Sequence, residues 1–196
     1  MPAVVLIGDS IRMGYQDTVR RELVGAAQVW APEENGAHTV NVLVHLHPWV
    51  LSRRPDLVHV NAGLHDLKTI AFGERENLVP LEGYRRNVRL ILRLVRERAG
   101  AQVIWATTTP VQEAKHNAAH ANWKDFQRYA ADVAACNEAA RAVCGELGVP
   151  VNDLYAVATE AGLERVQAPD GVHFTAEGYA LLGRAVAASC RAALGA

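Results

Sequence analysis

Cysteine, aromatic residues and long apolar runs are scarce in this sequence, and neither sign of charge is in excess. The chain of 196 residues contains three cysteines, and Cys136, Cys144 and Cys190 stand in alanine-rich segments with a helical pattern. Their odd number and their spacing fit neither a disulfide framework nor a zinc site. We therefore expect buried, unreactive thiols in a reducing compartment.

The charges are almost balanced, with 20 basic against 21 acidic residues and a net charge of -1. Such a chain lacks the broad positive field with which proteins bind nucleic acid or an anionic membrane. No apolar run approaches the roughly 20 residues that a membrane-spanning helix needs. The first residues carry no basic leader, so we expect a cytoplasmic protein without a signal peptide. At about 150 residues per domain, the length favours one domain over residues 1–196.

Short runs rich in β-branched residues alternate with segments of helical period. The predicted strands are 3–7, 27–30, 57–61, 102–106 and 149–152, and the predicted helices are 15–24, 39–51, 83–98, 125–147 and 175–194. We expect Pro48 to kink or end the second helix, and we expect the least regular structure over 68–80 and 111–123. This α/β order predicts a three-layer α/β/α sandwich around a flavodoxin-like parallel sheet of about five strands.

The first predicted strand ends in the tripeptide Gly8-Asp9-Ser10, at the sheet edge where ligands bind in such folds. In one interpretation this is a strand-to-helix turn in which Asp9 or Ser10 caps the next helix. In the other, Ser10 is a nucleophile whose own amide lies at a helix N-terminus and stabilises a developing oxyanion. A serine nucleophile needs a base within hydrogen-bond reach.

The candidate base lies near the other end of the chain, where Asp170 and His173 stand three residues apart just before the last predicted helix. The carboxylate of Asp170 would fix the tautomer of the imidazole while the second ring nitrogen takes the serine proton. The plainer alternative is an Asx-turn at Asp170 and a surface histidine.

Two further loops follow predicted strands. His65 comes after Gly63, which permits a tight turn, and its ring can donate an N–H bond. Gly36 and Ala37 follow the second strand, and the backbone amide of either can donate to an oxyanion.

Together these four segments resemble the SGNH, or GDSL-type, hydrolase superfamily of esterases and lipases, over a span from Gly8 to Gly178. The resemblance implies Ser10 as nucleophile, His173 as general base and Asp170 as its orienting acid. It also implies an oxyanion hole made by the Ser10 and Gly36 amides together with His65.

The sequence departs from the superfamily pattern in two places. His65 stands where the third block usually has asparagine, and Asp66 would either hold the His65 tautomer or favour its charged form. The second block matches loosely, which leaves Gly36 and Ala37 as rival amide donors.

The resemblance implies two-step acyl transfer to water, with no metal and no organic cofactor. Aromatic residues make up only 6% of the chain, which does not suggest the broad apolar face of a fatty-acyl lipase. The length and layout are similar to the small carbohydrate-type acetylesterases of the superfamily. We therefore expect a neutral, small-molecule, short-chain acyl or acetyl ester as substrate, with residues 68–80 and the region of Trp123 lining its pocket, and no nucleic-acid or membrane partner.

Three alternatives stay open. The first is metal chemistry, because His45, His47, His116 and His120 are candidate ligands, although no general base of the His-Glu-X-X-His kind accompanies them. The second is a binding module without catalytic activity. The third is a thioesterase or acyltransferase that uses the same triad.

Overall fold

The computed structural model describes residues 1–70, 75–119 and 126–195. Its main sheet has five parallel strands in the order β2-β1-β3-β6-β7. The strands are β1 (Ala3–Gly8), β2 (Gln28–Trp30), β3 (Leu57–Asn61), β6 (Gln102–Ala106) and β7 (Val151–Asn152). This is the strand order of a flavodoxin-like doubly wound sheet, so the predicted fold class is confirmed.

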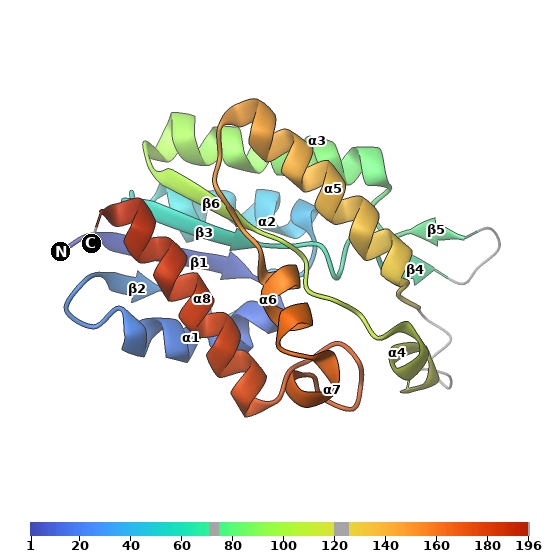
Figure 1. Ribbon diagram of the computed structural model, residues 1–196. Helices are drawn as coiled ribbons and strands as arrows, with labels where there is room; N and C mark the ends of the chain where they lie inside the picture. Colours follow the sequence, from blue (N-terminus) through green and yellow to red (C-terminus); the bar gives the residue numbers. More distant parts are fainter. Residues whose placement is uncertain (71–74, 120–125, 196) are drawn as a thin grey trace.

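Helices cover both faces of the sheet (Figure 1). One layer consists of α1 (Ser10–Glu22), α6 (Leu154–Glu160), α7 (Leu163–Val166) and α8 (Ala176–Leu194), and the other of α2 (Thr39–Leu46), α3 (Leu81–Leu94) and α5 (Ala130–Leu147). Wider π-helical turns, His47–Leu51 and Val95–Ala99, continue α2 and α3. The three predicted layers are therefore present.

Several boundaries differ from those expected. The first helix begins at Ser10 instead of Tyr15, because the Asp9 side chain accepts a bond from the Ile11 amide at 2.9 Å and caps it. Pro48 lies in the π-helical turn after α2, as expected of a proline near a helix end. Helix α5 begins at Ala130, and the predicted start at Asp125 lies outside the described residues.

Regular structure also occurs where little was expected. A short antiparallel hairpin, β4 (Thr69–Ile70) with β5 (Glu76–Asn77), and helix α4 (Glu113–Ala119) lie in the two segments predicted to be irregular. The strands of the main sheet point toward the end of the molecule that carries these elements (Figure 1). The hairpin and α4 therefore border the sheet edge at which a ligand would bind.

The core lies between the two helical layers, and all five residues of the central strand β3 are buried. Cys136, Cys144 and Cys190 are free and buried. Burial raises the pKa of the Cys136 and Cys190 thiols to about 12 and that of Cys144 to about 11. The thiols are thus packed as small apolar groups and hold little thiolate at neutral pH.

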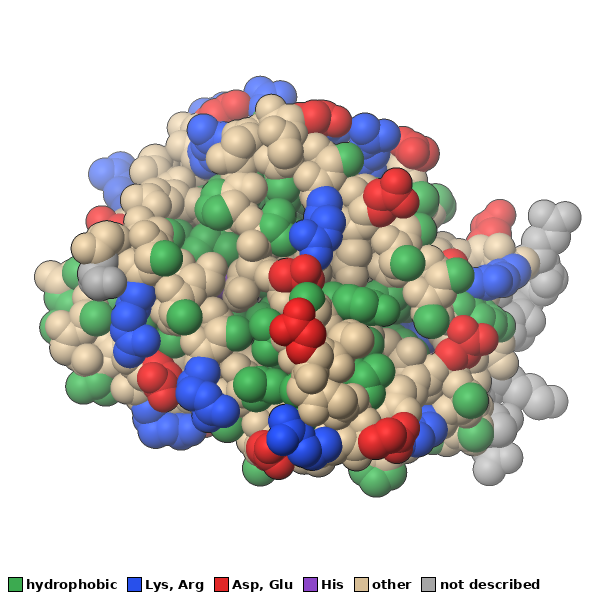
Figure 2. Space-filling view, in the orientation of Figure 1, with side chains coloured by type: hydrophobic (Ala, Val, Ile, Leu, Met, Phe, Trp, Pro, Cys, Tyr) green, Lys and Arg blue, Asp and Glu red, His purple; other side chains and the backbone are tan. Residues whose placement is uncertain are grey.

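None of the helices in the described part of the chain is long and apolar enough to cross a membrane. On the face formed by α8, α6 and α5, acidic and basic side chains are interspersed (Figure 2). That face therefore has no large patch of a single sign.

Candidate active site

Ser10, His65, Asp170 and His173 line one pocket with a volume of about 260 Å³. The other lining residues are Asn35, Leu64, Lys68, His116, Phe126, Arg128 and Val172. The pocket lies beyond the carboxyl ends of the strands, since Ser10 follows β1 and His65 follows β3. Four of the five site residues predicted from the sequence therefore meet in one cavity, and Gly36 lies beside it.

Ser10, His173 and Asp170 are connected by hydrogen bonds, although Ser10 and His173 are 163 positions apart in the sequence. The Ser10 Oγ lies 3.0 Å from Nε2 of His173, and Nδ1 of the same ring lies 2.5 Å from Oδ2 of Asp170. The second carboxylate oxygen of Asp170 accepts the backbone amides of Val172 and His173 at 3.0 and 2.9 Å. The three groups thus have the arrangement in which a histidine can take the serine proton while the carboxylate stabilises the imidazolium that forms.

The Asp170 carboxylate stays ionised at neutral pH. Partial burial raises its pKa, but the hydrogen bonds from the His173 ring and from the two amides outweigh that effect and hold the pKa below its usual range. The Asx-turn considered as the plainer alternative is present as well, and it orients the carboxylate toward His173.

Asp9 and Ser10 have separate tasks at the start of α1. Asp9 is 1% exposed and caps the helix through the Ile11 amide. Burial raises the pKa of Asp9 to about 6, against the bond from Ile11 and the nearby Arg128 cation. Because Asp9 provides the cap, the Ser10 hydroxyl is left to pair with His173.

The loop after β2 holds its backbone amides differently from the expectation. The Gly36 amide donates to the Gly8 carbonyl oxygen at 2.9 Å, and the Ala37 amide donates to Oδ1 of Asn35 at 2.8 Å. A Cβ at Gly36 would lie 2.7 Å from the Gly8 carbonyl oxygen, so only glycine permits this close approach. Both candidate oxyanion donors are thus bonded within the chain, and the Asn35 side chain lines the pocket.

Sequence reasoning missed Arg12 of α1, which holds this loop in place. Its side chain is fully buried and donates to the carbonyl oxygens of Pro32 at 2.9 Å and Glu34 at 2.6 Å. Two of its nitrogens also reach the Gly8 carbonyl at 3.3 and 3.4 Å. An arginine next to Ile11, on the face of α1 that packs inward, is the signal that could have found it.

His65 is a neutral ring at physiological pH. Burial, aided by the cations of Lys68 and Arg128, lowers its pKa to about 3. A neutral imidazole has one N–H donor, so His65 can offer the hydrogen bond that an asparagine side chain would offer.

Asp66 takes neither of the roles considered for it. Its carboxylate accepts the Thr39 amide at 3.0 and 3.1 Å and the Thr39 hydroxyl at 2.5 Å, and that hydroxyl accepts from Asn87 at 2.9 Å. Burial raises the pKa of Asp66 to about 7. The residue therefore anchors the start of α2 and not the His65 ring.

The candidate metal ligands do not assemble in the described part of the chain, which holds no group of three or more His, Cys, Asp or Glu placed for a metal ion. His45 stacks on Trp49 with ring centroids 4.6 Å apart. His116 lies in the pocket with its Nε2 at 3.0 Å from Arg128. His120 lies outside the described residues, as does Trp123, which was expected to line the pocket.

Comparison with known proteins gives one family match and many similar folds. The profile of the GDSL-like lipase/acylhydrolase family matches residues 6–181. No curated protein matches the sequence.

Among solved structures, the lipase/acylhydrolase from Enterococcus faecalis superposes with a TM-score of 0.81 at 23% identity, covering 98% of this chain and 97% of that one. A carbohydrate acetylesterase family member from Sinorhizobium meliloti gives a TM-score of 0.76 at 22% identity and covers 100% of both chains. The acetyl xylan esterase AlAXEase gives 0.73 at 17% identity, covering 95% of this chain and 98% of that one. At these identities the likeness concerns the fold.

Proposed function

Because this chain belongs to the GDSL-like lipase/acylhydrolase family and is thus a hydrolase, we propose that it is a serine esterase acting on a small carboxylic ester. The observation that carries the proposal is the hydrogen-bonded series from Ser10 through His173 to Asp170 in the wall of the pocket.

In the proposed reaction, Nε2 of His173 takes the proton of Ser10 while Oγ attacks the ester carbonyl carbon. Asp170 accepts the Nδ1–H bond and stabilises the imidazolium that forms. His173 then returns the proton to the leaving alcohol, and an acyl-enzyme remains on Ser10. Water, activated by the same ring, hydrolyses the acyl-enzyme and restores the serine. The cycle needs no metal and no organic cofactor.

The tetrahedral oxyanion needs donors that point at it before the reaction begins. We assign the Ser10 amide, which lies at the N-terminus of α1, and the N–H of the neutral His65 ring. For a third donor we favour the Asn35 carboxamide over the Gly36 amide, which is already bonded to Gly8. Since Oδ1 of Asn35 accepts the Ala37 amide, Nδ2 is the donor atom of that side chain.

The size of the pocket supports a short acyl group. Its volume of about 260 Å³ is below the range of roughly 300–1,000 Å³ that is usual for ligand pockets. An acetyl or similarly short acyl ester fits such a space better than a fatty-acyl ester does. The similarity of the fold to an acetyl xylan esterase and to a carbohydrate acetylesterase family member supports the same choice.

The test is hydrolysis of a small aryl acetate by the wild-type protein and by Ser10→Ala. We expect turnover by the wild type and a loss of about 10⁴-fold or more in the variant. Ser52→Ala, which removes an exposed hydroxyl at the end of the π-helical turn, is the matched control and should keep wild-type activity. Wild-type rates in Ser10→Ala would refute the triad.

A further inference from the structure

Arg128 is a buried cation that no described carboxylate contacts directly, although the charges of Asp9 and Asp170 act on it from farther away. The residue is 6% exposed, and among the described residues no Asp or Glu oxygen lies within 4.0 Å of its guanidinium. Nε donates to the Leu64 carbonyl oxygen at 2.7 Å, and Nη1 lies 3.0 Å from Nε2 of His116. No hydrogen bond to a described residue engages Nη2. Buried charges in proteins are normally paired, so this exception in a pocket wall calls for a partner.

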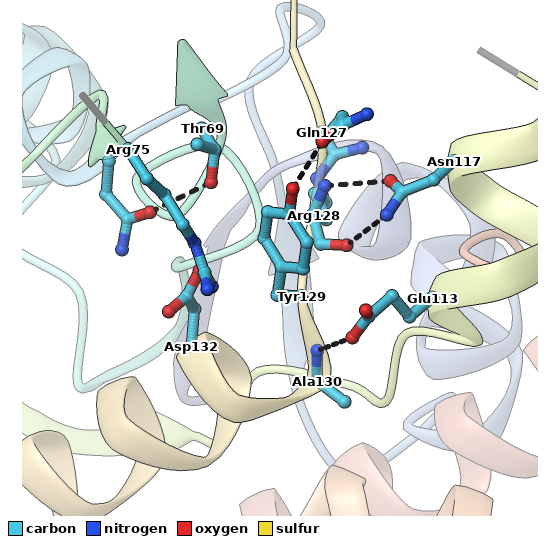
Figure 3. A network of polar contacts seen from close by, with 10 residues as sticks. Thr69, Arg75, Glu113, Asn117, Gln127, Arg128, Tyr129, Ala130 and Asp132 are labelled. Carbon is cyan, nitrogen blue, oxygen red and sulfur yellow. Dashed lines mark hydrogen bonds and ion pairs between the residues drawn. The ribbon is translucent and has the colours of Figure 1, made fainter. Parts of the chain in front are cut away.

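The backbone of Arg128 is held rigidly on two sides (Figure 3). The Asn117 side chain accepts the Arg128 amide at 3.1 Å and donates to the Arg128 carbonyl at 3.2 Å, as a neighbouring strand would. Gln127 exchanges two backbone bonds with Thr69, at 2.8 and 3.1 Å. Arg128 is therefore clamped between helix α4 and strand β4.

The residues that follow are fixed as well. The amide of Ala130 donates to the Glu113 carboxylate at 3.1 Å, and Arg75 stacks over Tyr129 while pairing with Asp132 at 2.9 Å (Figure 3). This scaffold limits the freedom of Arg128 to move toward solvent. The fold thus compensates for the free energy that is needed to remove the Arg128 guanidinium from water.

A second cation lies close to the first. Lys68 precedes β4 and is half-buried in the same pocket. Its Nζ lies 4.4 Å from the centroid of the Phe126 ring, and the Arg128 guanidinium carbon lies 4.9 Å from the same centroid. Burial, together with repulsion from Arg128, lowers the pKa of Lys68. We call Lys68, Phe126 and Arg128 the cationic wall of the pocket.

The nearby carboxylates offset this wall only in part. Asp170 is the only carboxylate among the described lining residues, and its charge is directed at His173 at 2.5 Å. Asp9 acts on both cations from outside the lining, and burial raises its pKa to about 6. Lys68 and Arg128, which both lie against the Phe126 ring, repel each other, and a bound anion relieves that repulsion.

We propose that Lys68 and Arg128 form an anion subsite within the catalytic pocket, so that the ester substrate carries a carboxylate or phosphate group near its scissile bond. This rests on the proposed esterase function and names its substrate class. The guanidinium offers a planar fork that matches an oxyacid group, and the ammonium adds a point charge beside it. The two cations on one wall of the pocket also attract anionic substrate to it.

The test compares esters that differ in one charge. 3-Acetoxybenzoate, which carries its charge on the alcohol side of the scissile ester, is compared with its uncharged methyl ester. 4-Nitrophenyl hydrogen glutarate, which carries its charge on the acyl side, is compared with the uncharged 4-nitrophenyl methyl glutarate. The rate of spontaneous hydrolysis is subtracted for both. We expect kcat/KM to be about tenfold or more higher for the anion in one of these pairs, and the preference to shrink as ionic strength rises.

Lys68→Gln should reduce that anion-to-neutral ratio about tenfold. Lys115→Gln removes the same charge from α4, outside the pocket, where the side chain pairs with Glu164, and should leave the ratio unchanged. Arg128→Lys, checked for folding by its melting temperature, should lower the ratio while keeping the charge, because the fork is lost.

The esterase function and the anion subsite can be refuted separately. If aryl acetates are not hydrolysed, the esterase function fails. If they are hydrolysed but neither anionic ester is preferred, the subsite fails. A loss in Lys68→Gln that is equal for neutral and anionic esters would also overturn the subsite, because the cations would then act on the oxyanion.

Binding provides a readout without turnover. In calorimetry on Ser10→Ala, 3-acetoxybenzoate or 4-nitrophenyl hydrogen glutarate should bind at least tenfold more tightly than the corresponding methyl ester. This difference in affinity should be lost in the double variant Ser10→Ala/Lys68→Gln. Equal affinities in both pairs would contradict the proposal.

Discussion

The two walls of the pocket are built in different ways. The catalytic wall, which comprises Ser10, Asn35, His65, Asp170 and His173, consists of short segments that directly follow a strand or precede a helix of the main fold. The cationic wall comes from the residue that precedes the two-residue strand β4 and from a segment that joins α4 to α5. In the proposed esterase, residues at the end of the sheet thus carry out the bond-breaking chemistry, and the hairpin and the segment before α5 recognise the substrate.

If this division holds, changes in the catalytic wall should lower activity on neutral and anionic esters alike. Changes in the cationic wall should instead lower the ratio of kcat/KM for the anionic ester to kcat/KM for the neutral ester, as expected for Lys68→Gln.

The largest effect in this comparison is expected for Asp170→Asn. The amide cannot hold the His173 tautomer or stabilise the imidazolium, so kcat/KM should fall on the order of 10⁴-fold for both ester classes. Steady-state kinetics on an ester pair measures this. A loss confined to the anionic ester would place Asp170 in recognition instead.

His65 is expected to have the next largest effect. His65→Ala removes one oxyanion donor, which is worth about 3 kcal/mol or roughly 10²–10³-fold in kcat. His65→Asn restores a side-chain N–H and should keep substantial activity. If the asparagine variant is as inactive as the alanine variant, the histidine has a role other than donation.

Asn35→Ala should cost about tenfold in kcat with little change in KM, because the interaction is made in the transition state. The matched variant is Asn41→Ala on α2, whose side chain donates to the Gly36 carbonyl at 3.0 Å outside the lining of the pocket. A wild-type kcat in Asn35→Ala would instead favour the Gly36 amide as the third oxyanion donor.

The smallest effect concerns the acid side of the pH profile. Burial puts the pKa of His65 at about 3, so its neutral form persists as the pH falls from 7 to 4, and His65 should not contribute to a loss of activity in that range. The pH profile of kcat/KM for His65→Asn should therefore have the same acid midpoint as the wild type. A shifted midpoint would show that His65 titrates in the working range.

The same division explains which parts of the site the sequence could predict. The bounds of 57–61 and 102–106 agree with those of β3 and β6, because a fully buried parallel strand is a continuous apolar run. Ser10, Asp170 and His173 could be found because each stands at a turn between regular elements. The Asp9 cap was one of the two interpretations of the first motif, but the predicted bound at Tyr15 followed the apolar pattern and so missed the first turns of α1.

The cationic wall could be found only in part, because Lys68 opens the segment 68–80 that was expected to line the pocket, whereas Arg128 was not expected there. Lys68 and Arg128 are brought together by the bridge between Thr69 and Gln127 and by the Asn117 side chain, and no local pattern encodes either contact. The net charge of -1 predicts a neutral ester, whereas the proposed subsite favours an anionic one, and a sum over the whole chain does not report the charge of one pocket. Long-range packing, not composition, determines that sign.

The central claim is that Ser10 is the nucleophile of a serine esterase. Its most direct test is to treat the protein with an aryl phosphonate, follow the loss of aryl acetate hydrolysis and map the modified residue by mass spectrometry. We expect one phosphonyl group per chain, on Ser10, formed in step with the loss of activity. Full activity after treatment, or modification of another residue in step with inactivation, would contradict it.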